Sequence, residues 1–188
     1  DFNLDLNLEK FTSSTFNMKI NKVSNDSYLN VFNQYITKSK IRPGNFNELN
    51  SKIDFSLEHE NYNLQGGIQS FENLRSKKQS DRYQYVLPYY NFDKDISQNY
   101  FNGNFSFNSN GNNKLDNTNK LETNVINNLT YNSLDFISNL GIKSNFGVNF
   151  KNLNSIGKKS TKYKSSTQSE LISLYNMDVS LPLIKESK

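Results

Sequence analysis

The residue types best suited to catalysis are scarce in this chain of 188 residues. His59 is the single histidine and cysteine is absent, which removes a Cys–His pair and a histidine-rich metal site from consideration. A Ser-His-Asp triad would have to include His59, which lies in a strand-like stretch without a nucleophile elbow nearby. The sequence therefore predicts that His59 is structural, that no residue is catalytic and that the protein is not an enzyme.

Two other stretches resemble ligand-binding loops but lack their decisive residues. Residues 108–111 have the amide and glycine spacing of a calcium loop, yet its first ligand would be Ser106 and its twelfth position is Asn117 instead of a bidentate Glu. The Gly66–Gly67 pair is not followed by a helical pattern, which a phosphate-binding loop requires. We therefore expect neither a metal ion nor a cofactor.

The clearest pattern is a strict alternation of apolar and polar residues. In the first ten residues, Phe2, Leu4, Leu6 and Leu8 alternate with polar side chains, which is typical of a β-strand with two unlike faces. Similar segments of about ten residues recur along the chain between stretches rich in Asn, Gly, Ser and Lys. The pattern predicts strands with lipid on one side and water on the other.

Composition excludes an ordinary globular core. Only 34% of the residues are apolar and Cys and Trp are absent, with a mean hydropathy of -0.78. Disorder is a poor explanation because 14 Phe and 11 Tyr stand at strand-like spacing. An AT-rich genome would also favour this composition. The net charge of +4 suits a partner with phosphates, but the interleaved acidic residues argue against nucleic acid.

About ten strand candidates follow one another, and no segment of useful length shows a helical apolar stripe. The sequence therefore predicts an all-β fold: an antiparallel up-and-down meander with essentially no helix, in which residues 1–10 and 168–183 form opposite edges. Residues 108–113 are expected to form a hairpin turn. The candidate strands are residues 1–10, 15–23, 28–37, 53–57, 62–68, 82–92, 102–108, 121–131, 136–150 and 168–183.

The pattern also predicts where several side chains lie. A hairpin of residues 1–10 and 15–23 would bring Lys19 near Asp5 or Glu9. Pro88 lacks a donor and should lie at a bulge or strand end. Tyr83, Tyr85, Leu87 and Tyr89 are expected on one face. A group of aromatic residues has two possible roles: part of an aromatic girdle at a membrane interface, or packing between neighbouring strands. The group consists of Tyr83, Tyr85, Tyr89, Tyr90, Tyr100 and Phe101.

No apolar run approaches the ~20 residues of a transmembrane helix, so a membrane could be crossed only by strands of a closed sheet. The chain starts inside a strand pattern without a signal-like segment, and it stops without a terminal aromatic residue. It is therefore expected to be a curved wall segment from inside a large outer-membrane β-barrel.

Several short motifs follow one another along nearly the whole chain. Their positions are Asn25, Asp26, Tyr28, Leu29, Arg82, Tyr83, Tyr85, Pro88, Asn117, Thr118, Asn119, Lys151, Asn152, Leu181, Pro182, Leu183 and Lys185. Each motif is short, but their order resembles the barrel domain of the lipopolysaccharide-assembly outer-membrane proteins (the LptD or organic-solvent-tolerance family).

The resemblance implies a location in the outer membrane of a Gram-negative bacterium. It implies a barrel that receives lipopolysaccharide from a periplasmic bridge, releases it into the outer leaflet and holds a plug lipoprotein in its lumen. Residues 1–188 would be a partial barrel domain without the family's periplasmic domain or closing strands. The matched positions are expected to be mainly structural, with Arg82, Lys151 and Lys185 as candidates for contact with lipid phosphate or plug.

Two alternatives remain open at this point. Another outer-membrane barrel, such as a nutrient receptor or an autotransporter, would show the same alternation. A soluble or surface-fibrous Asn-rich β-protein would replace lipid contacts by stacked Asn ladders.

Overall fold

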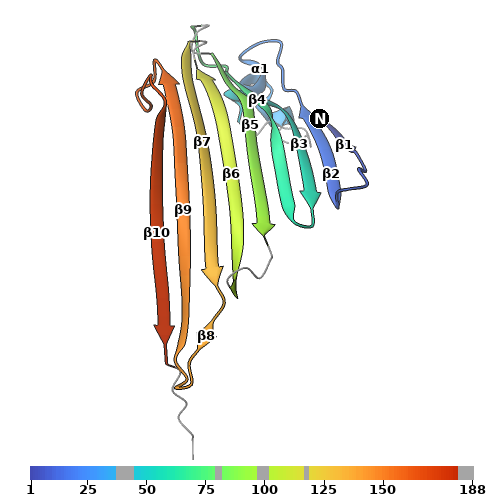
Figure 1. Ribbon diagram of the computed structural model, residues 1–188. Helices are drawn as coiled ribbons and strands as arrows, with labels where there is room; N and C mark the ends of the chain where they lie inside the picture. The colour runs from blue at the N-terminus through green and yellow to red at the C-terminus, as the bar shows by residue number, and fades with distance from the viewer. Residues whose placement is uncertain (37–44, 79–81, 97–101, 117–118, 182–188) are drawn as a thin grey trace, which may run out of the picture.

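The computed structural model describes residues 1–36, 45–78, 82–96, 102–116 and 119–181, which form one antiparallel sheet of ten strands (Figure 1). The strands are β1 (Phe2–Asp5), β2 (Ser13–Lys19), β3 (Glu48–His59), β4 (Tyr62–Asn73), β5 (Tyr83–Ile96), β6 (Gly103–Asp116), β7 (Lys120–Ser133), β8 (Phe136–Ile137), β9 (Lys143–Lys158) and β10 (Gln168–Ser180). Two short helices, α1 (Tyr28–Val31) and α2 (Asn33–Ile36), lie between β2 and β3.

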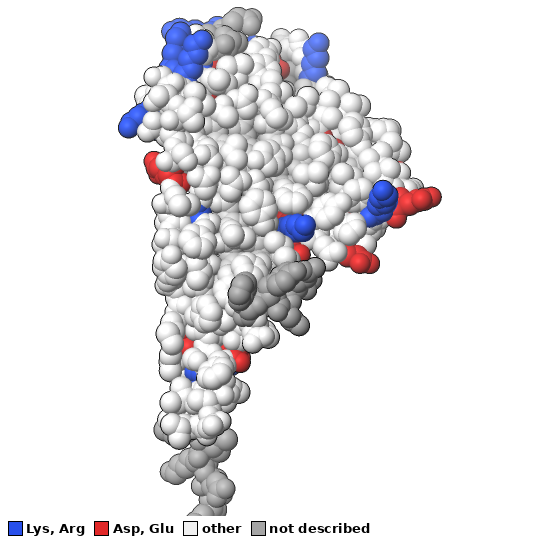
Figure 2. All heavy atoms as spheres, viewed as in Figure 1, with Lys and Arg blue, Asp and Glu red and all other residues white. Residues whose placement is uncertain are grey.

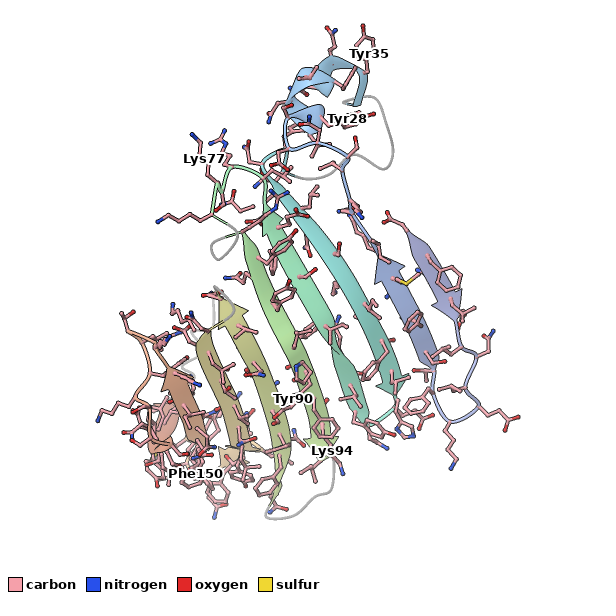
Figure 3. The ribbon with its side chains drawn as sticks, turned by 90° about the horizontal axis from the view of Figure 1, so that it is seen from above. Tyr28, Tyr35, Lys77, Tyr90, Lys94 and Phe150 are labelled. Carbon is pink, nitrogen blue, oxygen red and sulfur yellow. The ribbon has the colours of Figure 1, made fainter. Side chains whose placement is uncertain are left out.

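The strands pair almost entirely in sequence order. The path is β1-β2-β3-β4-β5-β6-β7-β9-β10, and the two-residue β8 pairs with β9 beside it. The sheet does not close: β1 and β10 are its two edges, as the sequence predicts. Figures 1 and 3 together show a twisted, curved layer, because β9 and β10 stand upright where β3 to β5 lean away. The all-β meander is therefore confirmed.

The sheet is a single layer with almost no core. Leu29, Leu49, Leu74 and Tyr131 are the buried hydrophobic residues in the described part of the chain. Three of them form one small cluster, in which Leu29 of α1 packs with Leu49 and Leu74, and Val23 and Phe46 lie against it. Elsewhere backbone pairing, and not a packed interior, holds the strands together.

The prediction of a strand over residues 28–37 is wrong for its described part, which forms α1 and α2. The reason is a helical spacing that the alternation obscured. Tyr28, Val31, Phe32 and Tyr35 stand at positions i, i+3, i+4 and i+7, and this spacing places them on one side of a helix. Leu29 turns the other way and is buried.

Residues 108–113 do not form a hairpin turn; they lie in the middle of β6. Asn and Gly favour turns, but here each residue has a partner on β7, from Asn108 opposite Asn128 to Asn113 opposite Thr123. The side chain of Asn108 also donates to Asp93 on β5 (2.6 Å). Cross-strand amide bonds therefore stabilise the run as a strand.

The predicted strand over residues 136–150 is also wrong, because β8 ends at Ile137 and β9 begins at Lys143. Between them Gly141 adopts a positive φ of 78°, which only glycine tolerates readily. The alternation does not reveal this turn. Phe136 of β8 and Ser144 of β9 are register partners on one face, and because both positions are even-numbered, the period-two pattern continues through the turn without a break.

The first strand is shorter than predicted. β1 ends at Asp5, whose carboxylate accepts a hydrogen bond from the N–H of Asn7 (3.2 Å), a residue with a φ of 47°. The register places Asp5 opposite Thr15, while Lys19 lies at the far end of β2. The expected pairing of Lys19 with Asp5 or Glu9 is therefore wrong.

Pro88 lies at a bulge, as its missing N–H predicts. Val86 pairs with Gln69 and Tyr89 with Gly67, so two residues of β5 oppose one residue of β4. Asn113 of β6 donates its side-chain amide to the carbonyl of Leu87 in the bulge (2.8 Å). The extra residue moves Tyr89 to the face opposite Tyr83 and Tyr85, which corrects the prediction that they share a face.

Two adjacent glycines of β4 give a test of this tight pairing. A Cβ on Gly67 would stand 2.3 Å from the backbone oxygen of Ile53, whereas a Cβ on Gly66 would meet only the ring edge of Phe55, at 3.0 Å, and the Tyr89 carbonyl, at 3.3 Å. Gly67→Ala should therefore destabilise the sheet by about 1–3 kcal/mol. Gly66→Ala should cost less, because a side chain can move. Urea unfolding in detergent micelles measures both, and equal losses would contradict the register.

Candidate functional site

The register divides the sheet into two chemically different faces. Partners across strands share a face, so the set that includes Phe55 can be followed from β1 to β10. We call this the apolar face. Its large residues are Phe2, Leu4, Phe16, Met18, Leu49, Ile53, Phe55, Leu57, Tyr62, Leu64, Ile68, Tyr83, Tyr85, Tyr90, Phe92, Ile96, Phe105, Phe107, Leu115, Leu121, Val125, Leu129, Tyr131, Phe136, Phe146, Val148, Phe150, Ile156, Leu171, Tyr175, Met177 and Val179.

Aromatic rings connect the strands along the apolar face. Phe105 of β6 packs on Tyr131 of β7 with 4.6 Å between ring centroids, and Tyr131 packs on Phe146 of β9 at 5.5 Å. Phe92 and Phe107 continue the contact from β5 to β6 at 6.2 Å. All three pairs are tilted, and their centroid distances lie in the range in which aromatic rings attract one another, so the rings stabilise the register of this face.

In the described chain, α1 covers one end of the apolar face, where Leu29 packs on Leu49 of β3, and most of the rest of the face is left open. Met177 is 70% exposed and Leu171 is 72% exposed on β10. The side of the molecule seen in Figure 2 carries few charged atoms over its middle. A continuous apolar surface of this kind marks contact with lipid or with another protein.

The opposite face, which we call the polar face, carries most of the charge of the strands. Its ion pairs include Lys52 with Asp54 (3.2 Å) and Lys120 with Glu122 (3.2 Å). Its charged residues are Asp5, Lys19, Glu48, Lys52, Asp54, Glu58, Asp93, Asp95, Lys114, Asp116, Lys120, Glu122, Lys143, Lys151, Glu170 and Asp178. On the apolar face the described strands place only Glu72, Lys94 and Lys158, each within three residues of a strand end.

One row of polar side chains crosses the apolar face. The Tyr90 hydroxyl lies 3.1 Å from the Ser109 hydroxyl, which donates to the Asn127 side-chain oxygen (2.8 Å). The Asn127 amide donates to Asn152 (3.4 Å), and the Asn152 amide donates to Ser169 (3.2 Å). Because the proton of Ser109 goes to Asn127, Tyr90 is the donor to Ser109, and all four bonds run in one direction.

This polar row has a physical consequence for the surface. An unpaired amide or hydroxyl in hydrocarbon costs several kcal/mol. Mutual hydrogen bonds across β5, β6, β7, β9 and β10 remove much of that cost. The row is therefore compatible with an apolar environment, although it interrupts the aromatic surface.

The connection between β9 and β10 folds over the polar face. Ser160 donates to the carboxylate of Glu122 (2.7 Å), and the Asn124 amide donates to the Tyr163 hydroxyl (3.2 Å). Gly157 provides the space, because a Cβ there would stand 2.7 Å from Ser160. The connection therefore narrows the space in front of β7 and β9.

Two of the motifs singled out in the sequence meet at the end of the sheet that is uppermost in Figure 1. Arg82 donates twice to Asp26 (2.7 and 3.0 Å), 56 residues away, and its Nε donates to Glu72 (2.7 Å). The Tyr83 hydroxyl also donates to Glu72 (3.1 Å). The hydrogen bonds from Arg82 hold the pKa of Asp26 below its usual value, and the two carboxylates raise the pKa of Arg82. Arg82 thus holds the segment before α1 against β4.

The other predicted positions have mainly structural contacts. Asn25 accepts from the Ser27 N–H (2.9 Å), Tyr28 packs on Phe32 and Leu29 is buried. Tyr85 stacks near Tyr83, at 6.2 Å. Lys151 lies on the polar face and its neighbour Asn152 in the polar row. Asn119 and Leu181 lie outside the strands, just before β7 and just after β10. Outside the described residues are Tyr100, Phe101, Asn117, Thr118, Pro182, Leu183 and Lys185.

His59 stacks on Tyr62 across the β3–β4 turn, with 4.6 Å between ring centroids. Among the described residues, no three His, Asp or Glu side chains are grouped so as to hold a metal ion. Over the same residues no helix is long and apolar enough to cross a membrane.

Comparison with protein-family models and with curated proteins finds no match to this chain. The function must therefore be inferred from the surface itself.

The Arg82–Asp26 contact gives a pH-dependent prediction. Because the pKa of Asp26 is lowered in the folded chain, the stabilisation is present above the ordinary carboxyl pKa of 3.8 and is lost as pH falls through the lower folded value. Asp26→Asn should imitate the acid state at neutral pH and accelerate hydrogen exchange of the α1 amides. Asp135→Asn, which breaks a contact with Lys143 at the opposite end of the sheet, is the control. Unchanged α1 exchange in Asp26→Asn would refute this role.

Proposed function

We propose that this chain forms part of the wall of a membrane-spanning β-barrel, with the apolar face toward lipid and the polar face toward a water-filled lumen. The segregation of charge carries the proposal. Charged residues follow the polar face along its length, whereas Glu72, Lys94 and Lys158 on the apolar face stand near strand ends. A lipid-facing Lys or Arg costs about 2–4 kcal/mol at mid-membrane and much less at the interfaces, which accounts for this distribution.

Strand length supports the same proposal. The strands β3 to β7 and β9 have 12 to 16 residues, more than the roughly 9–11 that a tilted strand needs to cross a bilayer. Hydrocarbon offers no partner to a free backbone N–H or C=O. The proposal therefore requires that further strands pair with β1 and β10 and close the barrel.

We further propose lipopolysaccharide assembly in a Gram-negative outer membrane as the specific function. Its support is the sequence resemblance, together with the Asp26–Arg82 contact that joins two of the matched motifs. In this role the lumen would accommodate a plug lipoprotein, and lipopolysaccharide would arrive from periplasmic bridge components. Of the three basic residues that the resemblance suggests for such a contact, Lys151 lies on the polar face, on β9, and would meet the plug.

A second candidate is a barrel for solute uptake. The connection of residues 159–167 favours it, because Ser160 and Tyr163 fold over the polar face as a constricting loop does in a channel. A soluble Asn-rich β-protein has less support, because it would expose the whole apolar face to water.

Two adjacent residues in the middle of β7 test the membrane-facing assignment. Val125→Arg places a guanidinium on the apolar face, far from the strand ends, and should reduce insertion into lipid vesicles by about 2–4 kcal/mol in folding free energy. Asn124→Arg places it on the polar face, opposite Asn112 of β6, and should be tolerated. Protease protection after reconstitution measures insertion. Equal effects of the two substitutions would contradict the assignment.

Depletion of the protein in its own cells separates the two specific functions. A role in lipopolysaccharide assembly predicts that newly made lipopolysaccharide fails to reach the cell surface, as measured with an impermeant label. Normal surface lipopolysaccharide with slower solute uptake would instead support the channel.

A further inference from the structure

The connections at the two ends of the sheet differ in charge. We define the upper rim as α1, α2, Arg82 and the connections 20–27, 45–47, 74–78 and 159–167, all at the top of Figure 1. The lower rim comprises the connections 6–12, 60–61, 134–135 and 138–142. Outside helices and strands, the described charged residues of the upper rim are Lys22, Asp26, Arg75, Lys77, Lys78, Arg82, Lys159, Lys162 and Lys164; those of the lower rim are Glu9, Lys10, Glu60 and Asp135.

The single carboxylate among the upper-rim connections does not offset this charge. Asp26 is bound by Arg82 in a two-pronged ion pair, so the remaining basic residues present an unbalanced positive surface. In the side of the molecule shown in Figure 2, Lys and Arg gather at this end.

The upper rim also exposes aromatic and apolar side chains. Leu29 fixes α1 to Leu49 and Leu74, and this contact turns the other side of the helical segment outward. Tyr35 is 70% exposed and Val31 is 64% exposed, and the exposed ring of Phe32 packs on Tyr28 at 4.8 Å. Figure 3 shows Tyr35 and Lys77 projecting at the same end of the sheet, apart from Lys94 and Phe150.

Exposed aromatics beside lysines are the combination that binds the interface of an anionic bilayer. Tyr and Phe rings settle at the headgroup level, and each Lys or Arg near an anionic surface adds attraction. The helical segment lies at the end of a wall whose apolar face is proposed to meet hydrocarbon. A membrane surface would therefore be continuous with that face.

We propose that the upper rim is an anionic-lipid anchor: residues 28–35 insert their aromatic side at the headgroup level, while Lys77, Lys78 and the neighbouring basic residues bind lipid phosphates. The anchor fixes which end of the wall faces the more anionic leaflet. It rests on the proposed membrane-spanning wall, and it adds the orientation and the lipid class.

The absence of tryptophan from the chain allows single-Trp reporters. Tyr35→Trp reports the upper rim, Leu140→Trp the lower rim and Phe150→Trp the apolar face. Each variant is prepared together with the strands that complete the barrel, with no other tryptophan present, and is refolded from detergent into vesicles of phosphatidylcholine, with or without phosphatidylglycerol. The emission maximum and quenching by brominated acyl chains are then measured.

The anchor predicts that Tyr35→Trp shifts to the blue and becomes quenched much more strongly when phosphatidylglycerol is present, while Leu140→Trp responds equally to both vesicles. Replacing Lys77 and Lys78 by Gln in the Tyr35→Trp background should weaken vesicle titration by about tenfold or more. Lys10→Gln with Lys94→Gln, at the lower end, is the matched control and should leave it unchanged.

The outcomes separate the two proposals. Quenching of Phe150→Trp without lipid-charge dependence of Tyr35→Trp would overturn the anchor and leave the wall intact. A charge-dependent Tyr35→Trp signal without quenching of Phe150→Trp would overturn the wall and the orienting role of the anchor, and would leave only an upper rim that binds anionic lipid. No quenching of either reporter would overturn both.

Discussion

A single-layered sheet has two faces and no interior, and this constraint shapes the whole molecule. Side chains alternate between the faces with a period of two. A shift of one strand by one residue against its neighbour would therefore move each of its side chains to the opposite face. Backbone pairing along strands of 12 to 16 residues and the ring contacts from Phe92 to Phe146 oppose such a slip. The separation of charge between the faces depends on that register.

Polar groups on the apolar face illustrate how the same constraint is met locally. The row from Tyr90 to Ser169 satisfies its hydroxyls and amides across strands instead of with water. Asn113 likewise donates to the carbonyl that the Pro88 bulge leaves at Leu87. Asn is thus a structural residue in this sheet: its side chain joins strands as the backbone does, and its abundance need not indicate loops.

Alternation alone predicted the fold class and the two edge strands, because it is a local property of each strand. It failed where two local signals competed. Residues 108–113 have the composition of a turn but belong to β6. The turn between β8 and β9 leaves Phe136 and Phe146 on one face, so the alternation of residues continues across it and gives no sign of the turn. The contact of Asp26 with Arg82 spans 56 residues and depends on how α1 docks, which no spacing in the sequence reveals. The helical spacing of Tyr28, Val31, Phe32 and Tyr35 was present and would have corrected the strand prediction.

The central claim is that one face of the sheet meets hydrocarbon and the other meets water. Because the chain has no cysteine, single cysteines along β7 in the reconstituted protein test it most directly with a water-soluble maleimide. The account predicts fast labelling of Asn124→Cys and Asn128→Cys on the polar face, and slow labelling of Val125→Cys and Leu129→Cys on the apolar face. Labelling without this alternation would contradict the account.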